Sequence, residues 1–201
     1  MGKEKGGGHV ARVIGLSGPF GAGCSTMARM LQEHGYRLIK ASKYIMEWAG
    51  ENDIGFAIPS ESSAERRRAL QVAGDILRMR EGSDAIARYA LRRVEEEKRA
   101  SDDPEGLSFA IDCLKNRAEI EFLRDKLGPS FTAVSVNSSV QSRVRRRSVI
   151  DSYGGNLRLI EKDDRKDRDE FGSDAEWGQQ VLRCDVAADI SIDNDENVET
   201  G

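Results

Sequence analysis

Long apolar runs are absent from this sequence, and cysteine and histidine are scarce. No stretch approaches the roughly 20 consecutive apolar residues that a membrane-spanning helix needs, and the N-terminus lacks the apolar segment of a signal peptide. The three cysteines stand far apart, at positions 24, 113 and 184, and the two histidines are His9 and His34. This spacing does not suit a zinc site. These absences favour free thiols in a reducing, cytoplasmic compartment and argue against a membrane partner.

Positive and negative charges are nearly balanced. The 201 residues contain 31 Lys and Arg against 35 Asp and Glu, which gives a net charge of −4 at pH 7. General nucleic-acid binding is therefore not expected, and any basic site must be local. The length suits one domain with a substantial core.

The two ends of the chain differ from the body of the domain. We expect residues 1–10 to form a flexible leader and residues 11–201 to form the domain. The last apolar segment, 188–192, is followed only by a short polar stretch, where a closing helix would normally cover a sheet. We therefore expect a chain truncated at its C-terminus, with a short natural tail as the alternative.

A glycine-rich loop between an expected strand and an expected helix is the most informative stretch. Residues 13–26 have the sequence V-I-G-L-S-G-P-F-G-A-G-C-S-T. Gly18 and Gly23 occupy the two glycine positions of the phosphate-binding motif G-x-x-x-x-G-K-[ST], and Ser25 occupies its Ser/Thr position. Cys24 stands where the motif has lysine.

The chemistry of such a loop depends mainly on its backbone. Glycines let several N–H groups turn toward a phosphate, and the following helix adds the positive end of its dipole. The missing ammonium costs roughly 3–4 kcal/mol of transition-state stabilisation, so binding can persist where phosphoryl transfer slows. The candidate phosphate-binding residues are Gly18, Gly21, Ala22, Gly23, Cys24, Ser25 and Thr26, and the Ser25 hydroxyl is a candidate Mg²⁺ ligand.

Strand-length apolar segments alternate with amphipathic helices along the chain. This alternation predicts an α/β fold, with a mostly parallel five-stranded sheet and helices on both faces. Strands are expected around 13–16 and over 36–41, 107–111, 131–136 and 188–192. Helices are expected from the loop to about residue 34 and over 42–48, 62–80, 85–98, 119–127, 140–148 and 176–184.

Ligands of parallel sheets bind at the carboxyl ends of the strands, where two polar residues are expected. Asp112 closes the segment 107–111, in the geometry that lets a carboxylate reach Mg²⁺ directly or through water. A turn or helix cap is the alternative role. Ser42 follows the segment 36–41 and is expected to cap the next helix.

A cluster of arginines ends the helix expected at 140–148. Arginine forks suit phosphate oxygens, and a mobile basic lid can close over a nucleotide. We expect a lid over about 143–173, with Arg143 and Arg146 as catalytic candidates beside Asp112. Favourable placement of cations at a helix C-terminus is the alternative.

Four further segments support a resemblance to a known group. They are R-R-R-A-L-Q-V-A-G-D-I-L-R, A-I-D-C-L-K-N-R-A-E-I-E-F-L-R, the basic helix and C-D-V-A-A-D-I-S-I-D-N-D. With the loop, they resemble the P-loop nucleoside monophosphate kinases, nearest to dephospho-coenzyme A kinase-like and deoxynucleotide kinase-like members. The lysine-free loop is similar to that of the kinase-like domain in front of deoxycytidylate deaminase-type domains.

The resemblance implies a three-layer P-loop kinase fold and two ligands. Mg²⁺ with ATP or GTP would bind at 18–26, and a nucleotide-like acceptor would bind at a separate set of residues. The acceptor-binding candidates are Ser42, Arg67, Gln71, Arg78 and Lys115. The resemblance also implies a C-terminal deaminase domain or a second copy of this chain as a partner, although this stretch contains no deaminase signature.

Three functions remain open from the sequence. The first is a nucleotide-binding sensor or regulator with little turnover. The second is an active nucleotide or dephospho-coenzyme A kinase in which an arginine of the basic helix replaces the missing lysine. The third is an interaction domain with a vestigial loop.

Overall fold

The computed structural model describes residues 12–61, 63–146, 158, 161, 162, 165 and 176–195. Its elements are, in chain order, β1 (Val13–Ser17), α1 (Cys24–Glu33), β2 (Arg37–Lys40), α2 (Ala41–Glu51), α3 (Ala64–Glu81), α4 (Ala85–Arg99), β3 (Phe109–Leu114), α5 (Arg117–Leu127), the 3₁₀ turn η1 (Gly128–Ser130), β4 (Phe131–Asn137), α6 (Val140–Arg145), α9 (Val181–Ala187) and β5 (Ile190–Asp193).

The five strands form one sheet in the order β2-β3-β1-β4-β5, and every pairing is parallel. Parallel neighbours need crossover connections, which the intervening helices supply. The predicted α/β fold with a parallel five-stranded sheet is therefore confirmed. Because β1 lies in the middle, the loop that follows it is flanked by the ends of β3 and β4.

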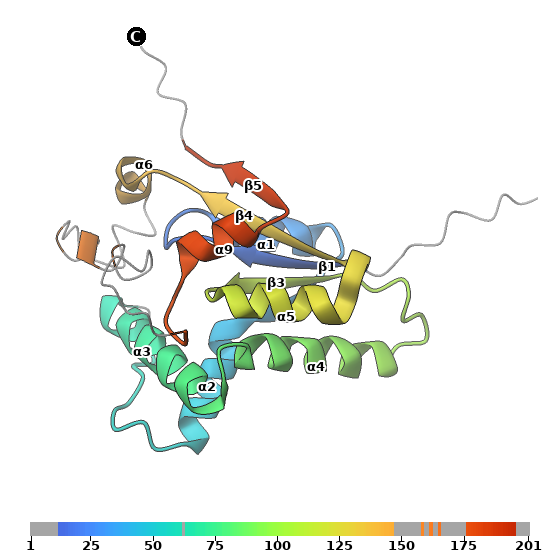
Figure 1. Cartoon of the computed structure of the whole chain (residues 1–201), viewed down its shortest axis with the longest axis horizontal. Helices are drawn as coiled ribbons and strands as arrows, with labels where there is room; N and C mark the ends of the chain where they lie inside the picture. Colours follow the sequence, from blue (N-terminus) through green and yellow to red (C-terminus); the bar gives the residue numbers. More distant parts are fainter. Residues whose placement is uncertain are drawn as a thin grey trace, which may run out of the picture.

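The sheet is covered on both faces. Leu16 of β1 packs in a cluster with Ala28 of α1, whereas Val13, on the opposite face, belongs to a cluster with Val94 of α4 and Leu123 of α5. This alternation follows from the period of two along a strand. Figure 1 shows α5 and α9 in front of the sheet and α1 behind it, so the expected three layers are present.

A third cluster joins α2, α3 and α4 beside the sheet. Its buried members include Trp48 of α2, Leu77 of α3 and Ile86 of α4. In Figure 1 the α2 and α3 helices lie at one end of the molecule, away from β4 and β5. This helical part borders the cavity described below.

Two boundaries at the strand ends differ from the sequence prediction. Strand β3 does not close at Asp112, because Leu114 is fully buried and pairs with Ser17 of β1. The register shifts between Leu16 and Ser17, which leaves Cys113 as an extra residue of the kind found in β-bulges. The prediction that Ser42 caps a helix is also wrong, because α2 begins one residue earlier with Lys40 at its N-cap position.

The helix predicted over 176–184 begins only at Val181. The residues before it are held by other elements, since the carbonyls of Glu176 and Gly178 accept hydrogen bonds from the Asn116 side chain at 2.7 and 2.8 Å. Tertiary bonding therefore overrides local helical propensity here.

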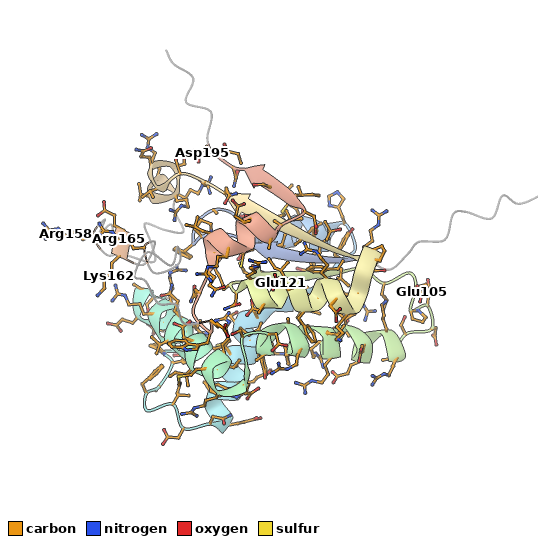
Figure 2. All side chains as sticks on the ribbon, in the orientation of Figure 1. Glu105, Glu121, Arg158, Lys162, Arg165 and Asp195 are labelled. Carbon is orange, nitrogen blue, oxygen red and sulfur yellow. The ribbon has the colours of Figure 1, made fainter. Side chains whose placement is uncertain are left out.

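Most of the lid expected over about 143–173 lies outside the described residues, as do the leader over 1–10 and the last six residues. Figure 2 labels three described and exposed basic residues within the lid range, Arg158, Lys162 and Arg165, and draws them on the side of α3 and α6. Within the described ranges, no helix is both long enough and apolar enough to span a bilayer.

Candidate nucleotide and phosphate site

The loop after β1 depends on glycine. Gly18, Gly21 and Gly23 have φ values of 155°, 78° and 117°, in the region that side chains with a Cβ avoid. A Cβ on Gly18 would also lie 2.3 Å from the carbonyl oxygen of Val136. The glycines at both ends of the predicted motif are therefore required by conformation and by space.

Every carbonyl from Gly18 to Gly23 accepts a hydrogen bond. Two of these bonds come from the local backbone: Ala22 N donates to Pro19 O at 3.1 Å, and Met27 N donates to Gly23 O at 2.9 Å. The other four come from side chains of distant elements, which we call the bracing side chains. They are Lys115 Nζ to Gly18 O at 2.5 Å, Arg143 to Phe20 O at 3.0 Å, Arg146 to Gly21 O, and Asn194 Nδ2 to Ala22 O at 2.7 Å.

These bonds fix the orientation of the loop's peptide groups. Within one peptide group the N–H points away from the carbonyl, so a carbonyl held by a partner also fixes the direction of the N–H of the following residue, and a rigid nest of N–H groups favours an anion. The loop continues directly into α1, whose first N–H groups have no partner within the helix. The structure therefore places a loop with fixed peptide groups directly before a helix N-terminus, the arrangement found at anion-binding loops.

A hydroxyl and a carboxylate meet beside the loop. Ser25, in the first turn of α1, donates its hydroxyl to Asp112 Oδ2 at 3.0 Å. Burial raises the pKa of the Asp112 carboxyl, against the hydrogen bond from Ser25 and the charge of Lys115, which lower it. Oxygen donors of this kind suit Mg²⁺, which is commonly held by one or two carboxylates together with substrate phosphates.

No cluster of three or more His, Cys, Asp or Glu side chains suited to a metal ion occurs among the residues that the structure describes. A metal at Ser25 and Asp112 would therefore need phosphate oxygens or water to complete its shell.

A buried thiol occupies the usual lysine position. Cys24 is 7% exposed, and its hydrogen bond with the Cys113 thiol lowers its pKa, although burial opposes this. The same hydrogen bond raises the pKa of Cys113 well above the usual value, and burial adds to that effect. The β3 bulge is what brings Cys113 to Cys24, and sequence spacing does not reveal this contact.

The loop opens into a cavity of about 710 Å³, and its lining residues fall into two groups, which we call its two ends. The loop end is lined by loop residues together with Asp112, Cys113 and Lys115. The other end is lined by α2 and α3 residues, which include Ile45, Leu70 and Gly74. A cavity of this size and mixed lining is large enough for a nucleotide-sized ligand.

All five acceptor candidates line this cavity: Ser42, Arg67, Gln71, Arg78 and Lys115. They divide between its ends. Arg67 lies over the Phe20 ring of the loop, 3.8 Å from its centroid. Arg78 is buried, and its Nε donates to Glu119 at 2.8 Å. Lys115 contacts the phosphate loop itself rather than the α2–α3 end.

The two arginines predicted as catalytic candidates brace the loop from α6 and the residue after it. Arg143 is 2% exposed and donates to Ser138 O and Phe20 O, both at 3.0 Å. Arg146 donates to Gly21 O and Asn194 O. Among the described residues that line the cavity, Arg146 is present and Arg143 is not.

Sequence reasoning did not assign the roles that three residues of this region have. Asn194 braces the loop from the residue after β5, and no local motif marks it. Glu119 is fully buried and accepts hydrogen bonds from Arg78, Lys115 N and Asn116 N; the capping-box spacing Asn116-x-x-Glu119 is the signal that could have found it. Gln179 lines the cavity, and its buried Oε1 has no hydrogen-bond partner among the described residues.

Comparisons with known proteins agree with this architecture. No protein-family model matches the chain. It is similar to the UPF0200 protein of Methanothrix thermoacetophila, with 27% identity over 196 residues, 92% of this chain and 88% of the relative. The UPF0200 protein of Methanothermobacter thermautotrophicus is 26% identical over 159 residues, 77% of this chain and 71% of the relative.

Among solved structures, TT1252 from Thermus thermophilus superposes with a TM-score of 0.51 at 19% identity, over 94% of this chain and 91% of that one. A shikimate kinase from Acinetobacter baumannii, in complex with shikimate, gives a TM-score of 0.46 at 16% identity, over 94% and 86%. The parallel strand order, the glycine loop between β1 and α1 and the likeness to TT1252 agree on an α/β fold of the P-loop type.

Proposed function

We propose that this protein binds ATP or GTP with Mg²⁺ at the loop over 18–26, as a regulatory or weakly active module of kinase fold. The observation that supports this most is that every carbonyl from Gly18 to Gly23 is hydrogen-bonded, which fixes the peptide groups of the loop before any ligand binds. Ser25 and Asp112 would hold Mg²⁺, which would neutralise phosphate charge. The thiol of Cys24 in the lysine position supports slow turnover rather than fast chemistry.

Phosphoryl transfer to a nucleotide-like acceptor is the second candidate function. The two-ended cavity supports it, because Ser42, Gln71 and Arg78 line the end that lies away from the phosphate loop. Deoxynucleoside monophosphates and dephospho-coenzyme A are the acceptors that the sequence resemblance suggests. The Oε1 of Gln179 would accept a hydrogen bond from a hydroxyl or amino group of such a ligand.

The partners and the compartment remain predictions. A deaminase domain elsewhere in the protein, a second copy of this chain and a cytoplasmic location rest on the sequence resemblance and on the composition. If the protein binds no nucleotide, the remaining function is that of an interaction domain with a vestigial loop.

Calorimetric titration with MgATP and MgGTP tests the proposal. We expect saturable heat with at least one of them, weakened by EDTA. Gly18→Ala should abolish the heat, because its Cβ would overlap the Val136 carbonyl. Gly50→Ala is the matched control, since nothing lies within 4 Å of that position. Absence of heat at millimolar nucleotide would leave only the interaction domain.

A coupled assay separates the two nucleotide-dependent functions. Deoxynucleoside monophosphates and dephospho-coenzyme A are offered as acceptors with the nucleotide that binds. Steady turnover of about 1 s⁻¹ or more, within the kinase range, would exclude a sensor, whereas binding without transfer would support it.

A further inference from the structure

We propose that Lys115, at the end of β3, supplies to a bound triphosphate the ammonium that the loop lacks at Cys24. The inference rests on the proposed function and assigns to Lys115 the charge-neutralising role at that site. It gives the residue a role different from the acceptor contact that the sequence resemblance implies.

The position of the Lys115 ammonium is defined by its contact with the loop. Lys115 follows Leu114, the last residue of β3, and its Nζ donates to Gly18 O at 2.5 Å across 97 positions of sequence. The residue lines the same end of the cavity as Cys24, Ser25 and Asp112. The cation therefore lies at the mouth of the phosphate loop.

The backbone of Lys115 is held on both sides. Its N–H donates to Glu119 Oε2 at 2.8 Å, and its carbonyl accepts a hydrogen bond from Gln180 N at 2.7 Å. Glu119 is itself fully buried, within the capping box of α5. A stem fixed in this way limits where the ammonium can go, which lowers the entropic cost of placing it on a ligand.

The electrostatics of the site agree with this position. The positive charge of Lys115 lowers the pKa of both Asp112 and Cys24, so it acts on the two groups that flank the expected phosphate. An ammonium carries three N–H donors, so a bond to Gly18 and a contact with a phosphate oxygen are compatible. Charge neutralisation depends on where the cation lies in space and not on which segment carries it.

Arg143 of α6 and Arg146, which follows α6, are less suited to this role. Arg143 is held by the Ser138 and Phe20 carbonyls and does not line the described cavity. Arg146 lines the cavity, but its guanidinium is held by two carbonyls, those of Gly21 and Asn194. The Cys24 side chain is several atoms shorter than lysine, which leaves room at the loop for a cation from β3.

Titration with magnesium tripolyphosphate tests the inference without a choice of base. We expect Lys115→Met to weaken tripolyphosphate binding by about 10- to 100-fold, as for loss of a hydrogen bond from a charged group. Lys126→Met, at the far end of α5 and exposed, makes the same change of net charge and should leave the affinity unchanged. Unfolding midpoints identify any variant that fails to fold.

A double variant separates the charge from the bracing bond. In Lys115→Met/Cys24→Lys the ammonium returns at the loop without its bond to Gly18, and most of the affinity should return. Equal affinity of Lys115→Met and wild type would overturn the inference. A loss that Cys24→Lys leaves unrepaired in a folded protein would also overturn it, and would assign Lys115 to bracing only.

Protection from acetylation provides a readout in the unaltered protein. Saturating magnesium tripolyphosphate should slow acetylation of Lys115, measured by mass spectrometry, and leave Lys126 unaffected. If calorimetry shows binding and Lys115 is not protected, the inference fails while the proposed function stands. If wild type binds neither tripolyphosphate nor nucleotide, the proposed function fails and the inference falls with it.

Discussion

The Asp112 side chain lies in a buried environment that disfavours its charged carboxylate form. Burial raises its pKa, so the native state holds the proton more tightly than the unfolded chain does. Between the unfolded pKa of about 3.9 and the raised native pKa, this group makes stability fall as pH rises, and above both values its contribution is constant. Asp112 therefore destabilises the fold at neutral pH, at a position where we propose that it holds Mg²⁺.

We expect Asp112→Asn to raise the midpoint of thermal unfolding at pH 7 and to remove the Mg²⁺ dependence of nucleotide binding. The gain in midpoint should shrink as the pH is lowered toward about 4, where the wild-type carboxyl takes up its proton. Thermal scans from pH 4 to pH 8 measure it.

Asp185 provides a control, because its pKa is shifted in the opposite direction to that of Asp112. Although burial raises its pKa, hydrogen bonds from Asn137, Ser135 and Ser191 outweigh this and lower it. Asp185→Asn should therefore lower the midpoint at pH 7. A lower midpoint for Asp112→Asn at pH 7 would contradict the account of burial.

The buried Oε1 of Gln179 has no hydrogen-bond partner within the described part of the chain, and this too should cost stability. Replacing it by leucine removes a buried acceptor without a partner, so the free energy of unfolding should rise by about 1–2 kcal/mol while binding of the second ligand weakens. Gln71→Leu is the comparison, because Gln71 is also buried there and has an interaction partner. Urea unfolding of both variants gives the signs; destabilisation by Gln179→Leu would mean that the oxygen is satisfied.

At the scale of single elements, the start of α5 ties the site to the rest of the fold. Asn116 is 1% exposed and caps α5 by accepting from Ala118 N at 2.9 Å. Its Nδ2 donates to the carbonyls of Glu176 and Gly178. The Asn116 side chain thus holds two parts of the site in place. One is the start of α5, beside Lys115, and the other is the segment that carries Gln179.

Asn116→Ala should therefore lower the free energy of unfolding by about 2–4 kcal/mol, because a cap and two buried carbonyl partners are lost together. Ser63→Ala is the control, since the hydrogen bond described for the Ser63 side chain is the cap of α3 at Arg66 N, and about 1 kcal/mol is expected there. Denaturant titrations compare the two. Losses of equal size would show that the bonds to the 176–178 segment add nothing.

The elements differ in how well the sequence predicts them. Glycine spacing and apolar runs are local, so β1, the loop and α1 are predicted almost to the residue. The end of β3 is not, because polar Asp112 interrupts an apolar run that burial of Leu114 resumes. The start of α9 is not either, because the bonds of Asn116 to the preceding segment join positions about 60 residues apart.

At the scale of the whole molecule, strand order assembles the site. β1 lies in the middle of the sheet, so residues that follow β3 and β5, together with residues within and after α6, reach the same loop. These are the bracing side chains Lys115, Asn194, Arg143 and Arg146, and their convergence depends on topology that no local pattern contains. The sequence predicts the glycine loop, but not the side chains that hold its carbonyls.

We propose that backbone N–H groups of residues 18–26 bind the phosphates of the ligand. Amide NMR spectra recorded during titration with magnesium tripolyphosphate observe these groups directly. The account predicts that the largest shift changes fall on amides of this loop, Gly21 and Gly23 included, and that Gly18→Ala suppresses them. Saturable binding with the largest changes elsewhere, and an unchanged loop, would contradict it.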